Sequence, residues 1–401
     1  MPSYVEAFYA RHPGLRQESF AEQKKRFDYD HFAWADALDE PMARLGYEIF
    51  NSDLAIEPML QAWARENMAS SPEYSASEIL VEQAKRFKPD ILMFDCVDRR
   101  LLKILRSSVG TIRVIFGWSG SAIGRGGVWD DMDLVLSCAP ESVDELRRLG
   151  HHSEHLNHAF DPRINDRLMA TKELIPISFI GSIVRRSTFH LQREEILLNV
   201  AKTLPLQIYS PNISAEPRDY LKAVVSGGIH AFSKALEYLY LLQAVKRGSP
   251  FVEKWLRVGS PPRLPISPKL AKRLRPGVYG LAYYQLMLDS AVSLNIHADS
   301  SPKFASNIRL FEATGVGSCL LTDWRDNLGE LFDADREVVA YRSASECVEK
   351  AKWLLENPKA RAEIAERGRD RIQRCHTFAH RSAELDAILR RYLAKNMVAG
   401  R

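Results

Sequence analysis

The sequence predicts an α/β protein with two domains, each built on a parallel sheet covered by helices. First, short apolar runs such as 91–94 and 112–116 alternate with amphipathic helical stretches, which is typical of a parallel sheet buried on both faces. Second, the chain has 401 residues, whereas a single core stops growing near roughly 250–300 residues. Third, the alternation restarts at 175–180, after a polar stretch that follows Pro162. Ligands of such sheets bind at the carboxyl ends of the strands.

The first domain is expected to span residues 1–168. Gly46 ends a long amphipathic helix, and Pro89 separates a later helix from a strand that ends at Asp95. We expect helices at 27–45, 58–67 and 77–88, and strands at 47–50, 91–94, 112–116, 133–137 and 155–158.

The second domain is expected to span residues 169–375, followed by a final helix within 376–401. Residues 211–276 interrupt its alternation, and we interpret them as an insertion because sheet connections are usually only a few residues long. The insertion contains an apolar helical stretch at 232–245 and then the proline-rich run GSPPRLPISP. Outside the insertion we expect strands at 175–180, 206–209, 291–296, 319–323 and 337–341. We expect one helix that ends at residue 200, and further helices that cover residues 283–290, 310–316, 328–332, 345–356, 359–375 and 377–394.

Two motifs of the first domain look like binding sites but lack the required spacing. The loop GWSGSAIGRGG at 117–127 fits neither GxGxxG nor GxxxxGK[ST], so its glycines either allow tight turns or help to hold an acceptor. A cluster of metal-ligand types follows the helix that ends at Gly150. In a strand, alternate side chains point to opposite faces, so we do not expect a metal to be held by His151, His152, Glu154, His155 and His158.

Two features of the second domain suit a nucleotide. The loop after the strand 175–180 begins with Gly181 and Ser182 and continues with Arg185, Arg186, His190 and Arg193; it is suited to a diphosphate, or it is a solvated basic loop. Glu312 lies in a short apolar helix beside a glycine-rich turn. If it is buried, its carboxylate needs donors such as the hydroxyls of a sugar or ribose; otherwise it points to solvent.

Charge and cysteine content limit the function classes. The net charge of +4 is too small to indicate binding to nucleic acid. The charge is unevenly distributed: residues 231–276 contain ten Lys or Arg and two acidic residues, a net charge of +8, so the rest of the chain carries −4. This stretch either lies on an anionic membrane surface, or its helix packs in the core while the charges are solvated. The chain has five cysteines and no CxxC pair, which argues against a disulfide framework. The first residues also lack the pattern of a secretory signal, so we expect the protein to be located in a reducing cytoplasm.

A set of segments in the second half carries a family resemblance. From about Ile177 to Leu389 the sequence resembles the CgeB-like glycosyltransferases, which belong to the wider glycosyltransferase group 1 class. The segments that match are FIGS at 179–182, VYG at 278–280, SLNIH at 293–297, SNIRLFEATGVGSCLLTD at 306–323, NLGELF at 327–332, EVVAY at 337–341 and HTFAHR at 376–381. The first half resembles the acceptor domain of the same proteins through LNHAFDP at 156–162.

The resemblance implies a GT-B fold, in which two Rossmann-like domains face a cleft and the final helix crosses back to the first domain. A nucleotide sugar of the UDP, GDP or dTDP type would bind the second domain as co-substrate, without a metal or another cofactor. Glu312 would hold the ribose, Asn307 and Arg309 would line the sugar and diphosphate, and the loop of Ser182 and Arg185 would cover the phosphates. The full donor-binding set comprises Gly181, Ser182, Arg185, Arg193, Tyr209, Tyr279, Asn307, Arg309 and Glu312.

One position departs from the family pattern. Many retaining members carry a second Glu eight positions before the ribose-binding one, and this chain has Phe304 there. An inverting enzyme would need a base from the first domain to take the acceptor proton. The unranked candidates are Asp95, Asp98, His12 and His31.

The leading hypothesis is transfer of a sugar to a glycan or lipid-linked acceptor, in surface polysaccharide or related glycan biosynthesis. The enzyme would be cytoplasmic, with a possible peripheral contact to the inner membrane face through 231–276. Two alternatives keep the same donor site: a GT-B epimerase that acts on a nucleotide sugar without an acceptor, and a degenerate transferase that serves as a binding subunit.

Overall fold

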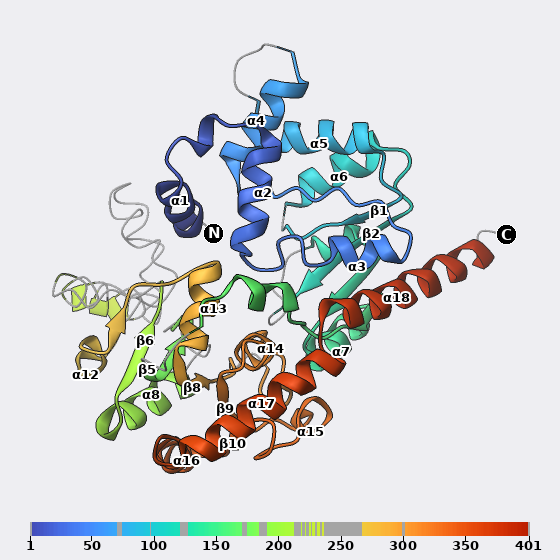
Figure 1. Ribbon diagram of the computed structural model, residues 1–401. Coiled ribbons are helices and arrows are strands. Elements are labelled where there is room, and N and C mark those ends of the chain that lie inside the picture. Colours follow the sequence, from blue (N-terminus) through green and yellow to red (C-terminus); the bar gives the residue numbers. More distant parts are fainter. Residues whose placement is uncertain are drawn as a thin grey trace.

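The computed structural model contains two parallel sheets, each with helices packed beside it (Figure 1). The α/β class with parallel sheets that the alternation predicts is therefore confirmed. The structure describes residues 2–69, 74–96, 98–120, 127–170, 175–183, 191–211, 267–298 and 301–399, together with single positions between 218 and 235. Arg185, Arg186, His190 and most of the stretch 232–245 lie outside the described residues.

The first sheet has four parallel strands in the order β1-β2-β3-β4. Each strand joins the next through a connection that includes a helix or a helical turn, as parallel pairing requires. Its strands are β1 (Ile91–Met93), β2 (Val114–Ser119), β3 (Leu134–Ser137) and β4 (Ser153–His155). The helices of this half are α1 (Pro2–Arg11), α2 (Phe20–Asp30), α3 (Asp39–Arg44), α4 (Glu57–Asn67), α5 (Ala76–Phe87), α6 (Arg99–Ser108) and α7 (Pro140–Arg148), with 3-10 turns at Leu15–Gln17, Trp129–Asp131 and Pro162–Arg167.

The second sheet has six parallel strands in the order β10-β9-β8-β5-β6-β7. Its centre is formed by β5 and β8, so the loops that follow these two strands lie side by side at the carboxyl edge. The strands are β5 (Ile175–Ile180), β6 (Leu206–Tyr209), β7 (Leu274–Arg275), β8 (Ser290–Asn295), β9 (Cys319–Asp323) and β10 (Val339–Tyr341). The helices are α8 (Leu191–Thr203), α12 (Pro268–Ala271), α13 (Leu281–Leu288), α14 (Arg309–Gly315), α15 (Leu328–Leu331), α16 (Ala344–Glu356), α17 (Pro358–Cys375) and α18 (Phe378–Ala399).

Apolar side chains bury the second sheet on both faces. Ile177 and Phe179 of β5 join one core cluster with Leu197 of α8, whereas Ile180 joins another with Phe311 of α14. All six residues of β8 are buried. This continuous burial is typical of a central strand in a parallel sheet that is covered on both faces.

The two segments that connect the halves of the molecule, around Phe160 and around His376, lie side by side. The amide of Phe160 donates to the carbonyl of His376, and the amide of Phe378 donates to the carbonyl of Phe160. The Phe160 ring packs so closely on α14 that a Cβ at Gly315 would come within 2.3 Å of it. A glycine is therefore required at Gly315 for this contact.

The last helix, α18, extends from the second half of the molecule along the first (Figure 1). Leu385, Ile388 and Leu389 share a core cluster with Val114 and Phe116 of the first sheet. The C-terminal helix thus completes the hydrophobic core of the first sheet.

The first two helices contact the second half of the chain. The carboxylate of Asp30 lies against Gly280, where a Cβ would come within 2.2 Å of its Oδ2, and the φ angle of Gly280 is +60°. The Tyr4 ring packs on Tyr279, with 5.9 Å between ring centroids, and its hydroxyl donates to Asp30. These contacts place α1 and α2 beside the loop that precedes α13.

Three predicted elements differ in the structure. The helix expected at 27–45 is broken: α2 ends at Asp30, and His31, Ala33 and Ala35 have positive φ angles before α3 begins at Asp39. No strand forms at 47–50, and β4 covers 153–155 rather than 155–158. Amphipathic spacing alone did not reveal the break, because tertiary contacts of Asp30 and His31 fix it. None of the described helices combines the length and apolar character needed to span a membrane.

Candidate active site

Several of the predicted donor-binding residues meet at the carboxyl edge of the second sheet. Gly181 follows β5, and a Cβ there would lie 3.3 Å from both terminal nitrogens of Arg309. Arg309 begins α14, so the helix start and the loop after β5 are in contact. The missing side chain at Gly181 leaves room for this guanidinium beside the backbone.

Asn307 links two strands to the start of α14. Its amide nitrogen donates to Asn295 Oδ1 at 2.9 Å, and its Oδ1 accepts the backbone amide of Arg309 at 3.0 Å. Asn295 in turn donates to Thr322 of β9 at 3.0 Å. The ends of β8 and β9 and the beginning of α14 are therefore held by one hydrogen-bond network.

Glu312 is buried in α14, with 5% of the residue exposed, so the solvent-facing interpretation is wrong. Its donors are two tyrosine hydroxyls of α13: Tyr283 at 2.5 Å to Oε2 and Tyr284 at 3.3 Å to Oε1. Burial raises the pKa of the Glu312 carboxyl above its usual range, although the Tyr283 hydroxyl and the Arg309 charge oppose this. The pKa values of both tyrosines are raised well above their usual range by burial, so both hydroxyls remain protonated donors.

Arg193 joins the two central loops. Its terminal nitrogens donate to the carbonyl of Ser182 after β5 and to the carbonyl of Ile296 after β8, both at 2.6 Å. The guanidinium also lies over the Phe179 ring, 5.6 Å from the centroid. Arg193 is buried, so its hydrogen bond to the Ser182 carbonyl holds this loop from the protein interior.

The remaining predicted donor residues are spread more widely. Tyr209 ends β6 and donates to Gln207 at 2.7 Å. Tyr279 packs between α1 and the turn after α2, with its ring centroid 6.1 Å from that of Phe32. Arg185 lies outside the described residues.

The four candidate bases occupy different environments. Asp95 is exposed just after β1, whereas the carboxylate of Asp98 accepts the Leu101 amide at 3.0 Å and caps α6. His12 uses Nδ1 in a contact with the Phe8 carbonyl at 2.9 Å. His31 is buried at 1% exposure, and burial lowers its pKa to about 4, although Asp161 and Asp36 oppose the shift.

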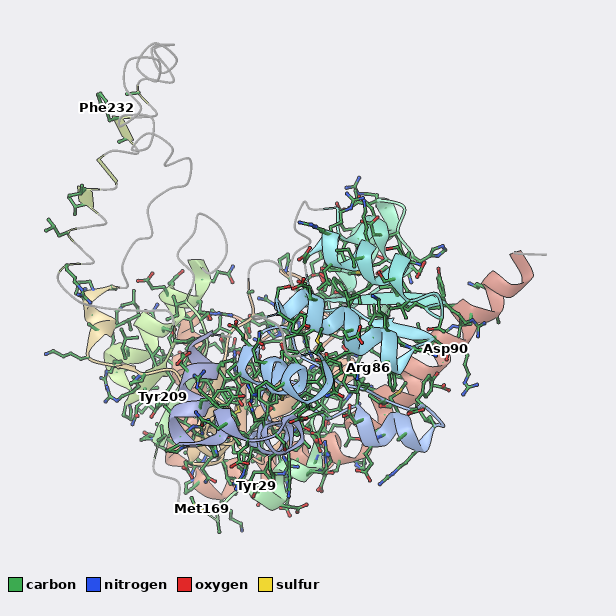
Figure 2. All side chains as sticks on the ribbon, turned by 90° about the horizontal axis from the view of Figure 1, so that it is seen from above. Tyr29, Arg86, Asp90, Met169, Tyr209 and Phe232 are labelled. Carbon is green, nitrogen blue, oxygen red and sulfur yellow. The ribbon has the colours of Figure 1, made fainter. Side chains whose placement is uncertain are left out.

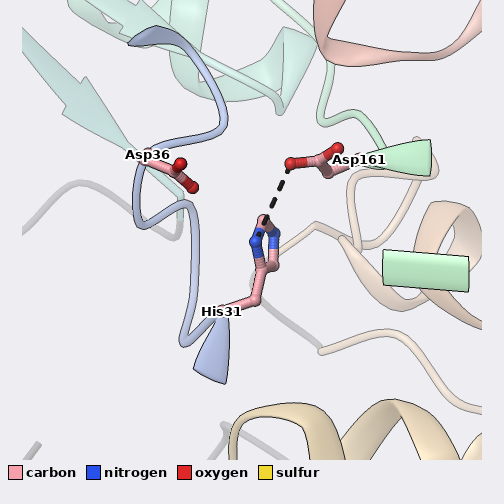
Figure 3. A group of neighbouring side chains, drawn as sticks. All are labelled: His31, Asp36 and Asp161. Carbon is pink, nitrogen blue, oxygen red and sulfur yellow. Dashed lines mark ion pairs between the residues drawn. The ribbon is translucent and has the colours of Figure 1, made fainter. Parts of the chain in front are cut away.

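His31 belongs to a three-residue group that sequence reasoning missed (Figure 3). One ligand atom from each of His31, Asp36 and Asp161 lies within 4.8 Å of the others. However, Arg163 already pairs with Asp36 at 2.9 Å and with Asp161 at 2.5 Å. A divalent cation would have to displace this guanidinium, so the group is better described as an ion-pair network that includes a neutral imidazole.

The side chains of the histidine-rich segment, residues 151–158, contact different parts of the molecule. His155 Nε2 contacts the Cys138 carbonyl, His152 packs on Tyr392, and His158 packs on Trp118. Among the described residues, no three of its metal-ligand types come together as a group.

A second group missed by sequence reasoning lies at the carboxyl edge of the second sheet. His297 follows β8, and its Nδ1 lies 2.7 Å from Asp323 Oδ1, which also accepts the His297 backbone amide at 3.0 Å. Arg325 pairs with the other oxygen of Asp323 at 2.7 Å. The signal available in the sequence was the position of a histidine directly after a buried strand, within the segment SLNIH.

One protein family matches part of the second half of the chain. Residues 238–387 match the family described as glycosyl transferase-like. This region contains β7 to β10 and every residue of the edge from Tyr279 to Arg325. No curated protein gives a significant match.

The solved structures that resemble the chain include several glycosyltransferases. Sucrose-phosphate synthase from Thermosynechococcus elongatus is 12% identical, with 86% of this chain and 81% of that chain covered and a TM-score of 0.48. Anabaena HepE, crystallised with UDP and glucose, is 12% identical, with 78% and 81% covered and a TM-score of 0.48. AviGT4, a glycosyltransferase of avilamycin A biosynthesis, is 12% identical, with 90% and 89% covered and a TM-score of 0.49.

At this identity and with TM-scores below 0.5, these similarities do not extend to substrates or residue roles. The family match is independent of them and covers the part of the edge from Tyr279 to Arg325. What the comparisons show is therefore a similarity of residues 238–387 to the glycosyl transferase-like family.

Proposed function

We propose that the protein is a glycosyltransferase that moves a sugar from a nucleotide-sugar donor to a hydroxyl group of a glycan or lipid-linked acceptor. The observation that carries the proposal is the buried carboxylate of Glu312 beside Arg309 and Asn307, at the carboxyl edge of a parallel sheet and inside the glycosyl transferase-like region. Ligands of parallel sheets bind at this edge.

The donor is proposed to contact the edge through three groups. The ribose hydroxyls would bind Glu312, because a carboxylate has about four acceptor positions and the two tyrosines use two of them. The diphosphate would lie by the backbone of Gly181 and Ser182, with Arg309 supplying positive charge beside it. Charge-assisted hydrogen bonds of this kind contribute roughly 1.5–3 kcal/mol each.

In the transfer step, an acceptor oxygen forms a bond to the anomeric carbon while the bond from that carbon to the diphosphate oxygen breaks. The nucleoside diphosphate leaves with the bonding electron pair, and the acceptor proton passes to a base. Guanidinium groups stabilise the negative charge that develops on the leaving oxygen. No step in this scheme requires a metal ion.

The environments of the candidate bases favour Asp95 for the proton transfer. Asp95 is exposed after β1, whereas Asp98 caps a helix, His12 contacts a carbonyl and His31 is enclosed by protein. A carboxylate from the first domain would suit an inverting reaction, consistent with Phe304 in place of the second Glu of many retaining enzymes.

A lipid-linked acceptor is supported by the composition of 231–276 and by exposed apolar residues at its start and just before it. Leu221, Val224 and Phe232 are 67%, 72% and 60% exposed, and Figure 2 shows Phe232 well away from the packed side chains of the two sheets. The net charge of +8 that follows would attract acidic headgroups, each basic residue near the surface adding about 1 kcal/mol.

The proposal is tested by a thermal-shift screen of the purified protein against UDP, GDP, dTDP and CMP sugars, followed by product analysis with the sugar nucleotide that stabilises it most. We expect one base to be preferred, and Glu312→Gln to remove the stabilisation. A wild-type protein that no member of the panel stabilises would contradict the proposal. Incubation with the donor alone distinguishes an epimerase, which forms a new sugar nucleotide, from a transferase, which needs an acceptor or water.

A further inference from the structure

His297 places a buried ring nitrogen at the carboxyl edge of the second sheet. The residue is 2% exposed, and its Nε2 atom is buried and makes no hydrogen bond to any residue that the structure describes. Buried polar atoms in proteins are nearly always hydrogen-bonded, so such an atom needs an explanation. Neither the donor roles argued above nor the proton transfer uses it.

The tautomer of His297 follows from its partners. The pKa of the Asp323 carboxyl lies below its usual value: burial would raise it, whereas the hydrogen bonds that it accepts from His297 and the charge of Arg325 lower it. An ionised carboxylate can only accept, so the proton lies on Nδ1, which is 2.7 Å from Asp323 Oδ1. In the neutral imidazole, Nε2 then carries a lone pair and acts as an acceptor.

The ring is held firmly in this orientation. Asp323 Oδ1 accepts both the ring nitrogen and the backbone amide of His297, and Oδ2 pairs with Arg325. The preceding carbonyl, that of Ile296, accepts a hydrogen bond from Arg193. His297 therefore stands fixed between the loop after β5 and the end of β9.

An acceptor nitrogen at this position selects a particular part of the donor. Diphosphate oxygens are themselves acceptors, so they match guanidinium groups rather than a neutral Nε2. Sugar hydroxyls can donate. Resting on the proposed function, we infer that His297 Nε2 accepts a hydrogen bond from a hydroxyl of the transferred sugar and thereby distinguishes the sugar nucleotide from the nucleoside diphosphate.

The segment that follows His297 is attached to the first domain. Glu141 of α7 accepts the amides of Lys303 and Phe304, both at 3.1 Å, and the Ser301 hydroxyl at 3.2 Å. Residues 301–304, a few positions after His297 in the chain, are thus held against α7 of the first domain.

The test compares two ligands that differ only in the sugar. Binding of UDP and UDP-glucose, or of GDP and GDP-mannose if the protein prefers guanine, is measured by calorimetry for the wild type, His297→Ala and Asp323→Asn. His152→Ala, which removes an imidazole from the first domain, is the control. We expect His297→Ala to lose tenfold or more in affinity for the sugar nucleotide while affinity for the diphosphate stays within about twofold, since tenfold corresponds to about 1.4 kcal/mol. Asp323→Asn should show the same selective loss, because it removes the group that fixes the tautomer.

Retained binding of the diphosphate also shows that the variants fold. A second measurement needs no variant: in long-range ¹H–¹⁵N spectra of the wild type, the Nε2 signal of His297 should shift with the sugar nucleotide but not with the diphosphate. Equal losses for both ligands, no loss, or an Nε2 signal that responds to the diphosphate would overturn the inference while leaving the proposed function intact. A wild type that binds neither member of any pair would overturn both.

Discussion

Replacing Glu312 tests the donor site most directly, because the structure defines how much hydrogen-bonding capacity this carboxylate has left. Tyr283 and Tyr284 donate one hydroxyl each. Of roughly four acceptor positions on the two oxygens, about two therefore remain for the ribose hydroxyls. Glu312→Gln keeps the shape of the side chain but removes the charge and one of the two acceptor oxygens.

The expected magnitude follows from the number of bonds. Two charge-assisted hydrogen bonds at roughly 1.5–3 kcal/mol each amount to about 3–6 kcal/mol, or about two to four powers of ten in Kd. Glu312→Ala should lose this affinity and also destabilise the fold, because two buried tyrosine hydroxyls lose their acceptor. Glu312→Gln should lose most of the affinity with a smaller effect on Tm.

Calorimetry with a nucleoside diphosphate and its 2′,3′-dideoxy analogue isolates the ribose contacts. The wild type should bind the normal ligand much more tightly than the analogue. In Glu312→Gln this preference should nearly vanish, because the missing hydroxyls and the missing carboxylate represent the same interaction. If the variant discriminates between the two ligands as strongly as the wild type does, Glu312 does not hold the ribose.

The raised pKa of Glu312 adds a dependence on pH with opposite signs for binding and stability. The ionised carboxylate is the stronger acceptor, so nucleotide affinity should rise as pH increases through the raised pKa. For folding, a carboxyl group whose pKa is higher in the folded state contributes its stability at low pH and loses it as pH rises through that pKa. Kd and Tm measured between about pH 5 and pH 8 should show both trends in the wild type and neither in Glu312→Gln. Trends that persist in the variant would assign them to other groups.

Three further predictions concern charge. Arg185→Ala should weaken binding of a nucleoside diphosphate far more than binding of the bare nucleoside, because its charge is proposed to face the phosphates; equal losses would remove that role. Transfer activity should survive excess EDTA, and a complete loss that manganese or magnesium restores would refute metal independence. The protein should sediment with acidic liposomes at low salt, and less so when the described basic residues of 231–276 are changed to Gln; wild-type protein that stays in the supernatant would exclude the membrane contact. Those residues are Lys269, Lys272, Arg273 and Arg275.

The sequence by itself determined the fold class and the edge at which the site lies. Apolar runs of strand length, separated by amphipathic stretches, predict parallel strands because both properties depend on residues close together in the chain. The resemblance to group 1 glycosyltransferases placed Gly181 and Asn307 in one donor site before their contacts were known. The structure joins them through Arg309, which lies against Gly181 and whose amide is bound by Asn307.

The tertiary structure alone decided which side chains complete the site and where one helix breaks. Asp323 fixes the tautomer of His297 from 26 positions away, and Tyr283 supplies Glu312 with a donor from a different helix. The expected helix at 27–45 ends at Asp30, whose carboxylate packs against a glycine of the other half. No local pattern encodes these features, because each depends on pairs of residues that meet only after the two sheets have formed and packed together.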